Sequence, residues 1–167
     1  GKETTAAWIT ALTSGLPTCL ILSRQTLPLY EQSGNQALRG GYILSDSEKE
    51  TPDVLLMASG SEVEQVMGAQ AELKKEGVDA RVISMPCMEI FLKQEPEYQE
   101  KVMPSAVRAR VSMEAGVTMP WYRFVGLDGK ALGMDHFGAS APAAVLFKQY
   151  GFTVENVVKA AHEVLKK

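Results

Sequence analysis

The fold is decided by residues 53–85, which read DVLLMASGSEVEQVMGAQAELKKEGVDARVISM. The stretch opens with an expected strand over residues 53–59, whose middle, residues 54–58, is apolar at every position, as in a strand that is buried on both faces. Apolar residues then recur about every 3.6 positions over residues 63–73, which predicts a helix that ends at Gly77. A second strand is expected over residues 80–85, and Pro86 closes it. Strand, helix and strand in this order predict a βαβ unit with parallel strands and a right-handed crossover.

Strand and helix patterns continue to alternate along the rest of the chain. Further strands are expected over residues 42–45, 110–114 and 131–134, and further helices over residues 88–93, 97–103, 121–125, 142–150 and 153–165. Thr153 is suited to cap the last of these helices, with Glu155 in its first turn. The whole pattern predicts an α/β fold, in which helices cover both faces of a mostly parallel sheet.

The first 32 residues have a different organisation. Residues 3–12 show a helical pattern, and residues 18–23 form an apolar run without alternation, as in another strand buried on both faces. One helix and one strand cannot form a core of their own. We therefore expect residues 1–32 to be the tail of another domain, residues 33–41 to be a linker, and residues 42–167 to be the α/β domain.

The composition excludes several classes of protein. The chain has 167 residues, 46% of them hydrophobic, and a formal net charge of −3, which argues against broad binding to nucleic acid or to an anionic membrane. No apolar run approaches the length of a membrane span, and the first residues lack the layout of a signal peptide. Cys19 and Cys87 are too few for a disulfide framework or a metal cluster, so reduced thiols in the cytoplasm are expected.

The turn formed by Ser59, Gly60 and Ser61 joins a buried strand to a helix. Backbone N–H groups at such a helix start suit an anion, and open α/β sheets bind ligands at the carboxyl ends of their strands. However, Ser61 is also suited to cap the helix, and Glu62 places a negative charge where a phosphate would lie. Helix capping and an anion site both remain open.

Several other polar residues have simpler interpretations. Glu114 ends a buried strand, but no second carboxylate or histidine stands at a fixed spacing from it, so we expect a hydrogen bond to the following helix. Gly126–Gly129 reads as a turn. His136, beside Asp135 in a glycine-flanked loop, is expected to be structural, and His162 on the last helix is expected to face solvent.

Arg24 is the best single candidate for a functional residue. It follows the apolar run of residues 18–23, at the carboxyl end of the expected strand. A guanidinium matches the geometry of phosphate and carboxylate groups with two parallel hydrogen bonds. Either an anionic ligand or a surface ion pair would account for an arginine at this place.

Leu22-Ser-Arg-Gln-Thr-Leu-Pro28 resembles the end of the middle, pyrimidine-binding domain of the transketolase family. Seven further runs, in the same order, are similar to the C-terminal domain of that family: Gly40-Gly-Tyr-Ile-Leu44, Ala58-Ser-Gly-Ser-Glu-Val63, Ala80-Arg-Val-Ile-Ser-Met-Pro86, Glu114-Ala-Gly116, Trp121-Tyr-Arg-Phe-Val-Gly126, Phe137-Gly-Ala-Ser-Ala-Pro142 and Phe152-Thr-Val-Glu-Asn-Val-Val158. Other thiamine enzymes have a similar last domain, but they are not expected to carry residues 22–28 and 137–142 together.

The resemblance implies a three-layer α/β/α sandwich, its sheet mostly parallel with one antiparallel strand. It implies a homodimeric enzyme of the pentose phosphate pathway that moves a two-carbon ketol unit between sugar phosphates. Such an enzyme uses thiamine diphosphate and a divalent cation, Mg²⁺ or Ca²⁺. The family's Ser-Arg-Gln motif assigns the binding of the sugar phosphate to Arg24.

The family's amino-terminal domain and most of its middle domain have no counterpart among these residues. The resemblance therefore implies a C-terminal fragment that is inactive alone, with no catalytic residue and no metal ligand of its own, and with the cofactor bound elsewhere in the enzyme. Two alternatives stay open: a regulatory domain that binds a nucleotide or another anion at Ser59–Ser61, and a dimerisation module of a related thiamine diphosphate enzyme.

Overall fold

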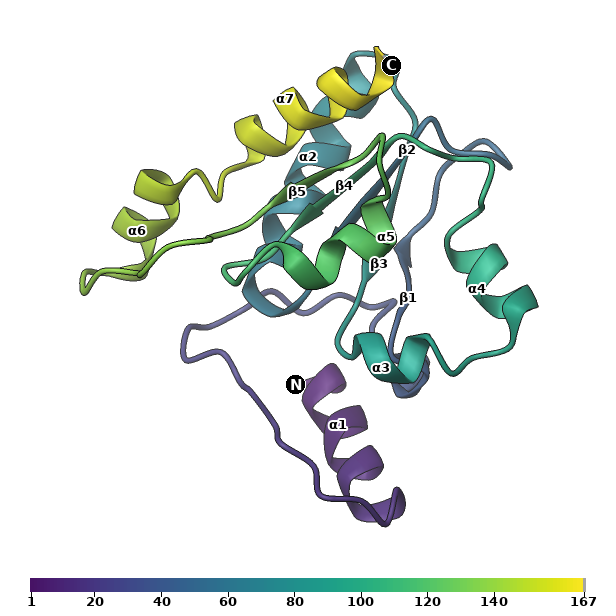
Figure 1. Cartoon of the computed structure of the whole chain (residues 1–167), viewed down its shortest axis with the longest axis vertical. Helices are drawn as coiled ribbons and strands as arrows, with labels where there is room; N and C mark the ends of the chain where they lie inside the picture. Colours follow the sequence, from purple (N-terminus) through teal and green to yellow (C-terminus); the bar gives the residue numbers. More distant parts are fainter. Residues whose placement is uncertain (167) are drawn as a thin grey trace.

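The computed structural model describes residues 1–166. Its centre is a five-stranded sheet in the order β1-β3-β2-β4-β5 (Figure 1). The strands are β1 (Tyr42–Ser45), β2 (Val54–Ala58), β3 (Ala80–Ser84), β4 (Arg110–Met113) and β5 (Lys130–Leu132). All neighbouring strands run parallel except β1, which is antiparallel to β3. The expected mostly parallel sheet with one antiparallel strand is confirmed.

Helices cover both faces of the sheet, so the expected three-layer sandwich is also confirmed (Figure 1). One face packs against the long helices α2 (Val63–Lys75) and α7 (Val154–Leu165). The other face packs against the short helices α3 (Met88–Phe91), α4 (Pro96–Val102) and α5 (Tyr122–Val125), with the 3-10 turn η3 (Met119–Trp121) before the last of them.

Strand β2 shows why its sequence is apolar without alternation. All five of its residues are buried. Leu56 packs into the core on the α2 and α7 face, whereas Leu55 and Met57 pack into the core on the opposite face. Because successive side chains of a strand point to opposite faces, only a strand that is covered on both sides needs apolar residues at every position.

Helices α2 and α7 approach each other closely. A Cβ atom on Gly68 of α2 would lie only 2.7 Å from Cγ2 of Val154 on α7, so no side chain fits between them. Thr153 caps α7 as expected, because its hydroxyl accepts a hydrogen bond of 3.4 Å from the backbone N–H of Asn156. His162 is partly exposed, and its Nε2 lies 2.6 Å from Oε2 of Glu76 at the end of α2.

The amino-terminal leader, residues 1–32, contains helix α1 (Lys2–Thr13), and Ala6 of this helix is 4% exposed. The strand expected over residues 18–23 is wrong, since residues 14–34 form neither helix nor strand. A strand needs a neighbour for its backbone hydrogen bonds, and the described residues provide none for this segment. Ile21 is accordingly 92% exposed.

The expected linker is folded against the domain. It contains the 3-10 helix η1 (Asn35–Arg39), in which Ala37 is 7% exposed and packs into the core. Helix α6 (Ala143–Tyr150), in contrast, buries none of its residues and lies at the edge of the molecule (Figure 1). No helix within residues 1–166 is both long enough and apolar enough to cross a membrane.

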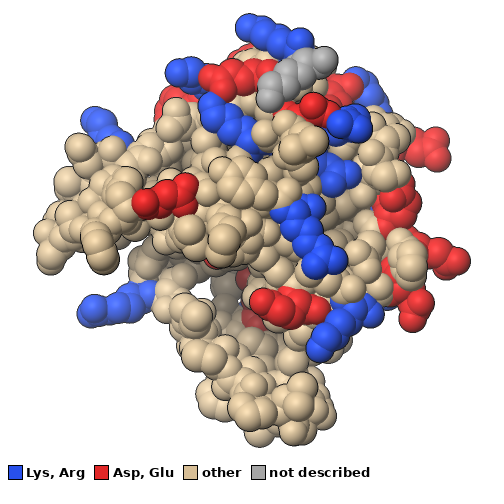
Figure 2. All heavy atoms as spheres, viewed as in Figure 1, with Lys and Arg blue, Asp and Glu red and all other residues tan. Residues whose placement is uncertain are grey.

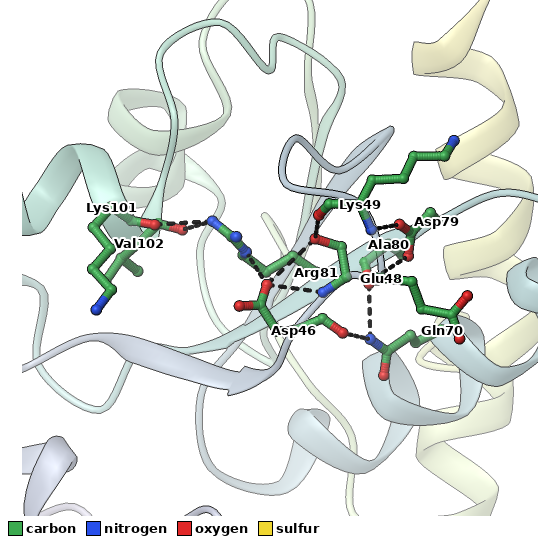
Figure 3. A network of polar contacts seen from close by, with 10 residues as sticks. Asp46, Glu48, Lys49, Gln70, Asp79, Ala80, Arg81, Lys101 and Val102 are labelled. Carbon is green, nitrogen blue, oxygen red and sulfur yellow. Dashed lines mark hydrogen bonds and ion pairs between the residues drawn. The ribbon is translucent and has the colours of Figure 1, made fainter.

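A network of hydrogen bonds and ion pairs links the segments that meet at the amino edge of the sheet, where β2 and β3 begin (Figure 3). Arg81 is 6% exposed, and its guanidinium donates to Oδ1 of Asp46 at 2.6 Å and to the carbonyl oxygen of Lys101 at 2.9 Å. Asp79 accepts hydrogen bonds from the backbone N–H groups of Glu48 and Lys49. The charged groups of this network thus bond to one another and to backbone groups, so the network has a structural role.

Candidate functional site

Several polar side chains that the hydrophobic core does not account for lie together at the carboxyl edge of the sheet. Strands β2, β3 and β4 end there at Ala58, Ser84 and Met113, and the antiparallel β1 begins there at Tyr42. In an open α/β sheet this is the edge at which ligands bind.

Glu114 joins the ends of two strands. Its Oε1 accepts a hydrogen bond of 2.8 Å from the hydroxyl of Ser59, which follows β2, and its Oε2 accepts one of 2.6 Å from the indole N–H of Trp121. Trp121 is 1% exposed. The expected hydrogen bond to the next helical segment is therefore present, and Glu114 links β2 and β4 to η3.

Glu62 is a second carboxylate at this edge, and it is 4% exposed. It accepts a hydrogen bond of 2.8 Å from the hydroxyl of Ser61. Burial raises the pKa of the Glu62 carboxyl, and the nearby charge of Glu114 raises it further, whereas hydrogen bonds from Ser61 and the backbone of Ala115 oppose the rise. The turn after β2 therefore lies between two acidic groups.

This arrangement bears on the two interpretations of the Ser59–Ser61 turn. Both hydroxyls donate to carboxylates, and neither makes a side-chain cap bond to the helix start. Gly60 has a left-handed φ of +56°, which a glycine adopts without strain. A phosphate at this turn would face the carboxylates of Glu62 and Glu114, which gives the anion site little support.

Glu3 is a third carboxylate at this edge, and the sequence analysis did not predict its role. Its Oε1 accepts hydrogen bonds of 2.7 Å from the Tyr42 hydroxyl and 2.6 Å from the Ser84 hydroxyl, and both donor residues are fully buried. Burial, followed by the charge of Glu3, raises the pKa of the Tyr42 hydroxyl far above its ordinary value. The only signal in the sequence was the presence of a tyrosine and a serine on buried strands, since buried hydroxyls need partners.

Arg24 lies in a bend of the leader and is exposed. Within residues 1–166, its guanidinium makes no hydrogen bond or ion pair. The preceding residue passes close to the carboxyl edge, since a Cβ atom on Gly60 would lie 3.6 Å from the hydroxyl oxygen of Ser23. The structure thus brings Ser23, the residue before Arg24, next to the turn that follows β2.

A groove of about 580 Å³ lies close to the place where the leader passes the turn after β2. One wall is formed by Gln25, Thr26 and Leu27 of the leader, and the others come from the start of α2 and from residues 143–155. The leader and the α/β domain therefore share a surface groove, and its lining begins at Gln25, the residue after Arg24.

The remaining candidates from the sequence are accounted for locally. Thr118 donates to Asp135 through its backbone N–H at 2.9 Å and through its hydroxyl at 2.8 Å. The centroid of the His136 ring lies 5.2 Å from the centroid of the Tyr150 ring. Residues 126–129 form the expected turn, and Cys19 and Cys87 are free thiols. These residues lie outside the carboxylate clusters described above.

A divalent metal and a diphosphate cofactor need a group of side chains that are free to act as metal ligands. Within residues 1–166, no three side chains of histidine, cysteine, aspartate or glutamate are grouped so as to hold a metal ion. The acidic groups at the carboxyl edge are already bonded to hydroxyl and indole donors. The described residues therefore do not fit a metal-diphosphate site.

Comparison with known proteins identifies the domain. The family model described as the transketolase-like TK C-terminal domain matches residues 40–153. The chain is 46% identical to the transketolase of Bacillus subtilis over 172 residues, covering 100% of this chain and 26% of that protein. It is 50% identical to the chloroplastic transketolase of Solanum tuberosum, covering 98% of this chain and 22% of that protein.

Solved structures agree with the sequence comparisons. Transketolase from Leishmania mexicana superimposes with a TM-score of 0.91 at 40% identity, covering 99% of this chain and 24% of that one. A Pichia stipitis transketolase in complex with sedoheptulose-7-phosphate superimposes with a TM-score of 0.88 at 34% identity, again covering 99% and 24%. The chain spans about a quarter of the length of these relatives. It belongs to the transketolase family, and it carries the C-terminal domain of that family together with the leader that precedes it.

Proposed function

We propose that this chain is the C-terminal part of a transketolase. The complete enzyme would transfer a two-carbon ketol unit from a ketose phosphate to an aldose phosphate in the pentose phosphate pathway. It would act in the cytoplasm as a homodimer. The observation that carries the proposal is the similarity to transketolases along the entire chain, leader included, at 46% identity over 100% of its length.

The leader supplies the proposed substrate contact. Arg24 is exposed and precedes Gln25, which lines the groove, and within residues 1–166 its guanidinium makes no hydrogen bond. A planar guanidinium can hold a phosphate through two parallel hydrogen bonds. We infer that Arg24 binds the phosphate of the sugar and so orients the far end of the substrate, where the reacting carbonyl lies. The solved Pichia stipitis structure in complex with sedoheptulose-7-phosphate is consistent with a sugar phosphate as the ligand.

Thiamine diphosphate and Mg²⁺ or Ca²⁺ belong to the proposal only for the complete enzyme. The described residues do not fit such a site, because they contain no metal-binding group and their buried carboxylates already have donors. We infer that the cofactor and the metal are bound by parts of the enzyme outside this chain.

The domain boundaries follow the same reasoning. We propose that residues 1–32 end the pyrimidine-binding domain, that residues 33–41 connect the two domains, and that residues 42–167 form the C-terminal domain. The uncharged stretch from Thr4 to Ser23 supports this division, because its apolar side chains are largely exposed in the isolated chain. Figure 2 shows the end of the molecule formed by α1 as a surface without charged side chains.

A direct assay tests the proposed function. The complete enzyme and this chain alone are each given a ketose phosphate donor, an aldose phosphate acceptor, thiamine diphosphate and Mg²⁺. Ketol transfer is expected from the complete enzyme and not from the chain alone. Transfer by the chain alone would contradict the division of labour proposed here, and absence of transfer by the complete enzyme would contradict the activity.

A further inference from the structure

The first turn of α1 is bonded to the α/β domain through one carboxylate. Oε1 of Glu3 accepts a hydrogen bond of 2.7 Å from the hydroxyl of Tyr42 and one of 2.6 Å from the hydroxyl of Ser84. Tyr42 begins β1 and Ser84 ends β3, and the two residues are direct partners in the antiparallel pairing of these strands. Directly opposed residues of an antiparallel pair carry their side chains next to each other on one face of the sheet. The register of β1 on β3 therefore brings the two hydroxyls together.

This hydroxyl pair, Tyr42 and Ser84, needs an acceptor. Both residues are 0% exposed, and within residues 1–166 Glu3 accepts both hydroxyl protons. The Tyr42 hydroxyl also lies 2.7 Å from that of Ser33, which acts as the donor there because Tyr42 gives its single proton to Glu3. Burial, followed by the charge of Glu3, raises the pKa of Tyr42 far above its ordinary value, so this hydroxyl keeps its proton at neutral pH. A buried donor that loses its acceptor destabilises the fold.

A small side chain one turn along α1 completes the contact. Ala6 is 4% exposed and packs into the same core cluster as Ala37 of η1 and Tyr42. Residues 3 and 6 lie on one face of the helix, so the carboxylate and the methyl group reach the domain together. The superposition on the Leishmania mexicana transketolase covers 99% of this chain with a TM-score of 0.91, in a protein chain about four times as long. This likeness supports the same placement of α1 against the domain in a longer transketolase.

We propose that the hydroxyl pair is the recognition site at which the C-terminal domain binds the helix that ends the preceding domain, and that Glu3 is the residue recognised. The inference rests on the proposed division of the chain, which places α1 at the end of the pyrimidine-binding domain. The chemistry of the site specifies its partner: a helix with a carboxylate in its first turn and a small residue one turn later. An apolar residue at position 3 would leave both buried hydroxyls without an acceptor.

Hydrogen exchange of this chain tests the proposal, because the chain contains both the helix and the hydroxyl pair. Glu3→Ala is expected to speed exchange of the hydrogen-bonded amides of α1 by about tenfold, whereas the amides of β2 and β4 keep their protection. Glu3→Gln keeps an acceptor oxygen without the charge and is expected to give an intermediate rate. Glu50→Ala is the matched control, since Glu50 is exposed and its carboxylate makes no hydrogen bond or ion pair within the described chain. It is expected to exchange like the parent.

A second background separates recognition from a general effect on the helix. A carboxylate in the first turn also stabilises a helix through its dipole, wherever the helix lies. The chain with both Tyr42→Phe and Ser84→Ala has no hydroxyl proton left to satisfy at this place. If Glu3 is recognised by the hydroxyl pair, adding Glu3→Ala to that background changes exchange of α1 much less than it does in the parent. An equal change in the two backgrounds, or a Glu3→Ala chain that exchanges like Glu50→Ala, would overturn the proposal.

The amides of β2 and β4 report whether each variant has kept its fold. If Glu3→Ala removed their protection as well, Tyr42→Phe would take its place, because it preserves the ring and removes one of the two bonds to Glu3. This variant is expected to speed exchange of α1 by less than Glu3→Ala, and an α1 that exchanged as in the parent would count against the proposal. The assay of ketol transfer by the complete enzyme uses none of these variants, so a failure here leaves the proposed function standing.

Discussion

The indole N–H of Trp121 donates a hydrogen bond of 2.6 Å to Oε2 of Glu114, seven residues earlier in the chain. The bond spans the connection between β4 and η3, and the other oxygen of the same carboxylate receives the hydroxyl of Ser59. Glu114 is thus a shared acceptor for two elements that approach the carboxyl edge from different parts of the sequence.

Replacing Glu114 by alanine should lower the free energy of unfolding by about 1–3 kcal/mol, because the buried indole N–H would lose its acceptor. Urea unfolding followed by the fluorescence of Trp121 measures the change, with Trp8→Phe as the background that removes the second tryptophan. Glu50→Ala, at an exposed site, should change the stability by no more than about 0.5 kcal/mol. Equal stabilities of the two variants would show that the bond contributes nothing.

The buried carboxyl of Glu62 predicts a particular dependence of stability on pH. Its pKa is raised in the folded state, mainly by burial. The folded state therefore binds the proton more tightly than the unfolded state, whose value is about 4.3. The contribution of Glu62 to stability is fully present below that pH and is lost as the pH rises through the higher folded-state value.

The Glu62→Gln variant should consequently gain stability relative to the parent chain as the pH is raised from about 4 towards neutrality. Urea unfolding at a series of pH values measures the difference. Glu155→Gln supplies a control of opposite sign, because hydrogen bonds from its own backbone N–H and from Thr153 lower the pKa of Glu155. A Glu62→Gln difference that did not vary with pH would contradict the effect of burial.

Gly68 and Val154 should be energetically coupled. Gly68→Ala favours the helix by about 1 kcal/mol in intrinsic propensity, but its Cβ would lie 2.7 Å from Cγ2 of Val154. We expect the clash to prevail and the variant to lose about 1 kcal/mol. In a Val154→Ala background the same change should instead stabilise. Thermal or urea unfolding of the four proteins tests this, and additive effects would show that the helices move apart freely.

The turn at Ser59–Ser61 should bind inorganic phosphate only weakly. Its two hydroxyls donate to Glu114 and Glu62, and both carboxylates would repel an anion. Calorimetric titration of the chain with phosphate at neutral pH should show no saturable heat in the micromolar range. Saturable micromolar binding that Ser61→Ala abolished would instead establish the regulatory anion site.

Arg24→Ala in the complete enzyme should raise KM for phosphorylated donors and acceptors and lower kcat/KM by about tenfold to a hundredfold, as expected for loss of charge-assisted hydrogen bonds. Arg24→Lys should recover only part of the loss, because a point charge cannot reproduce the guanidinium fork. Hydroxypyruvate, a donor without phosphate, should react almost normally. Equal losses towards both kinds of donor would assign Arg24 to another role.

The sequence predicted the α/β domain well because its elements satisfy local rules. Strand β2 is apolar at every position, and Thr153 caps α7 as its residue type suggests. Residues 18–23 carry the same kind of apolar run and form no strand. An apolar run indicates that a segment prefers to be buried. A strand also requires a neighbouring strand for its backbone hydrogen bonds, and the run itself does not show whether that neighbour is present.

The carboxyl edge was only partly predictable for a related reason. Arg24 and the turn at Ser59–Ser61 could be found from their places at the ends of apolar runs. Glu3 could not, because its partners Tyr42 and Ser84 are 39 and 81 residues away along the chain. In the sequence it is an ordinary glutamate in the first turn of a helix, and its role depends on the antiparallel placement of β1.

The reversed direction of β1 also determines where the chain enters and leaves the domain. Because β1 starts at the carboxyl edge, the preceding segment reaches that edge directly. It does not first have to cross the sheet, which would take about 13 Å, the length of a four-residue strand. The last turn of α7 lies instead beside the end of α2, with His162 against Glu76 (Figure 1). A fluorescent label on a side chain in the last turn of α7 would therefore stay clear of the carboxyl edge, whereas one on a side chain in the first turn of α1 would lie next to the clustered carboxylates.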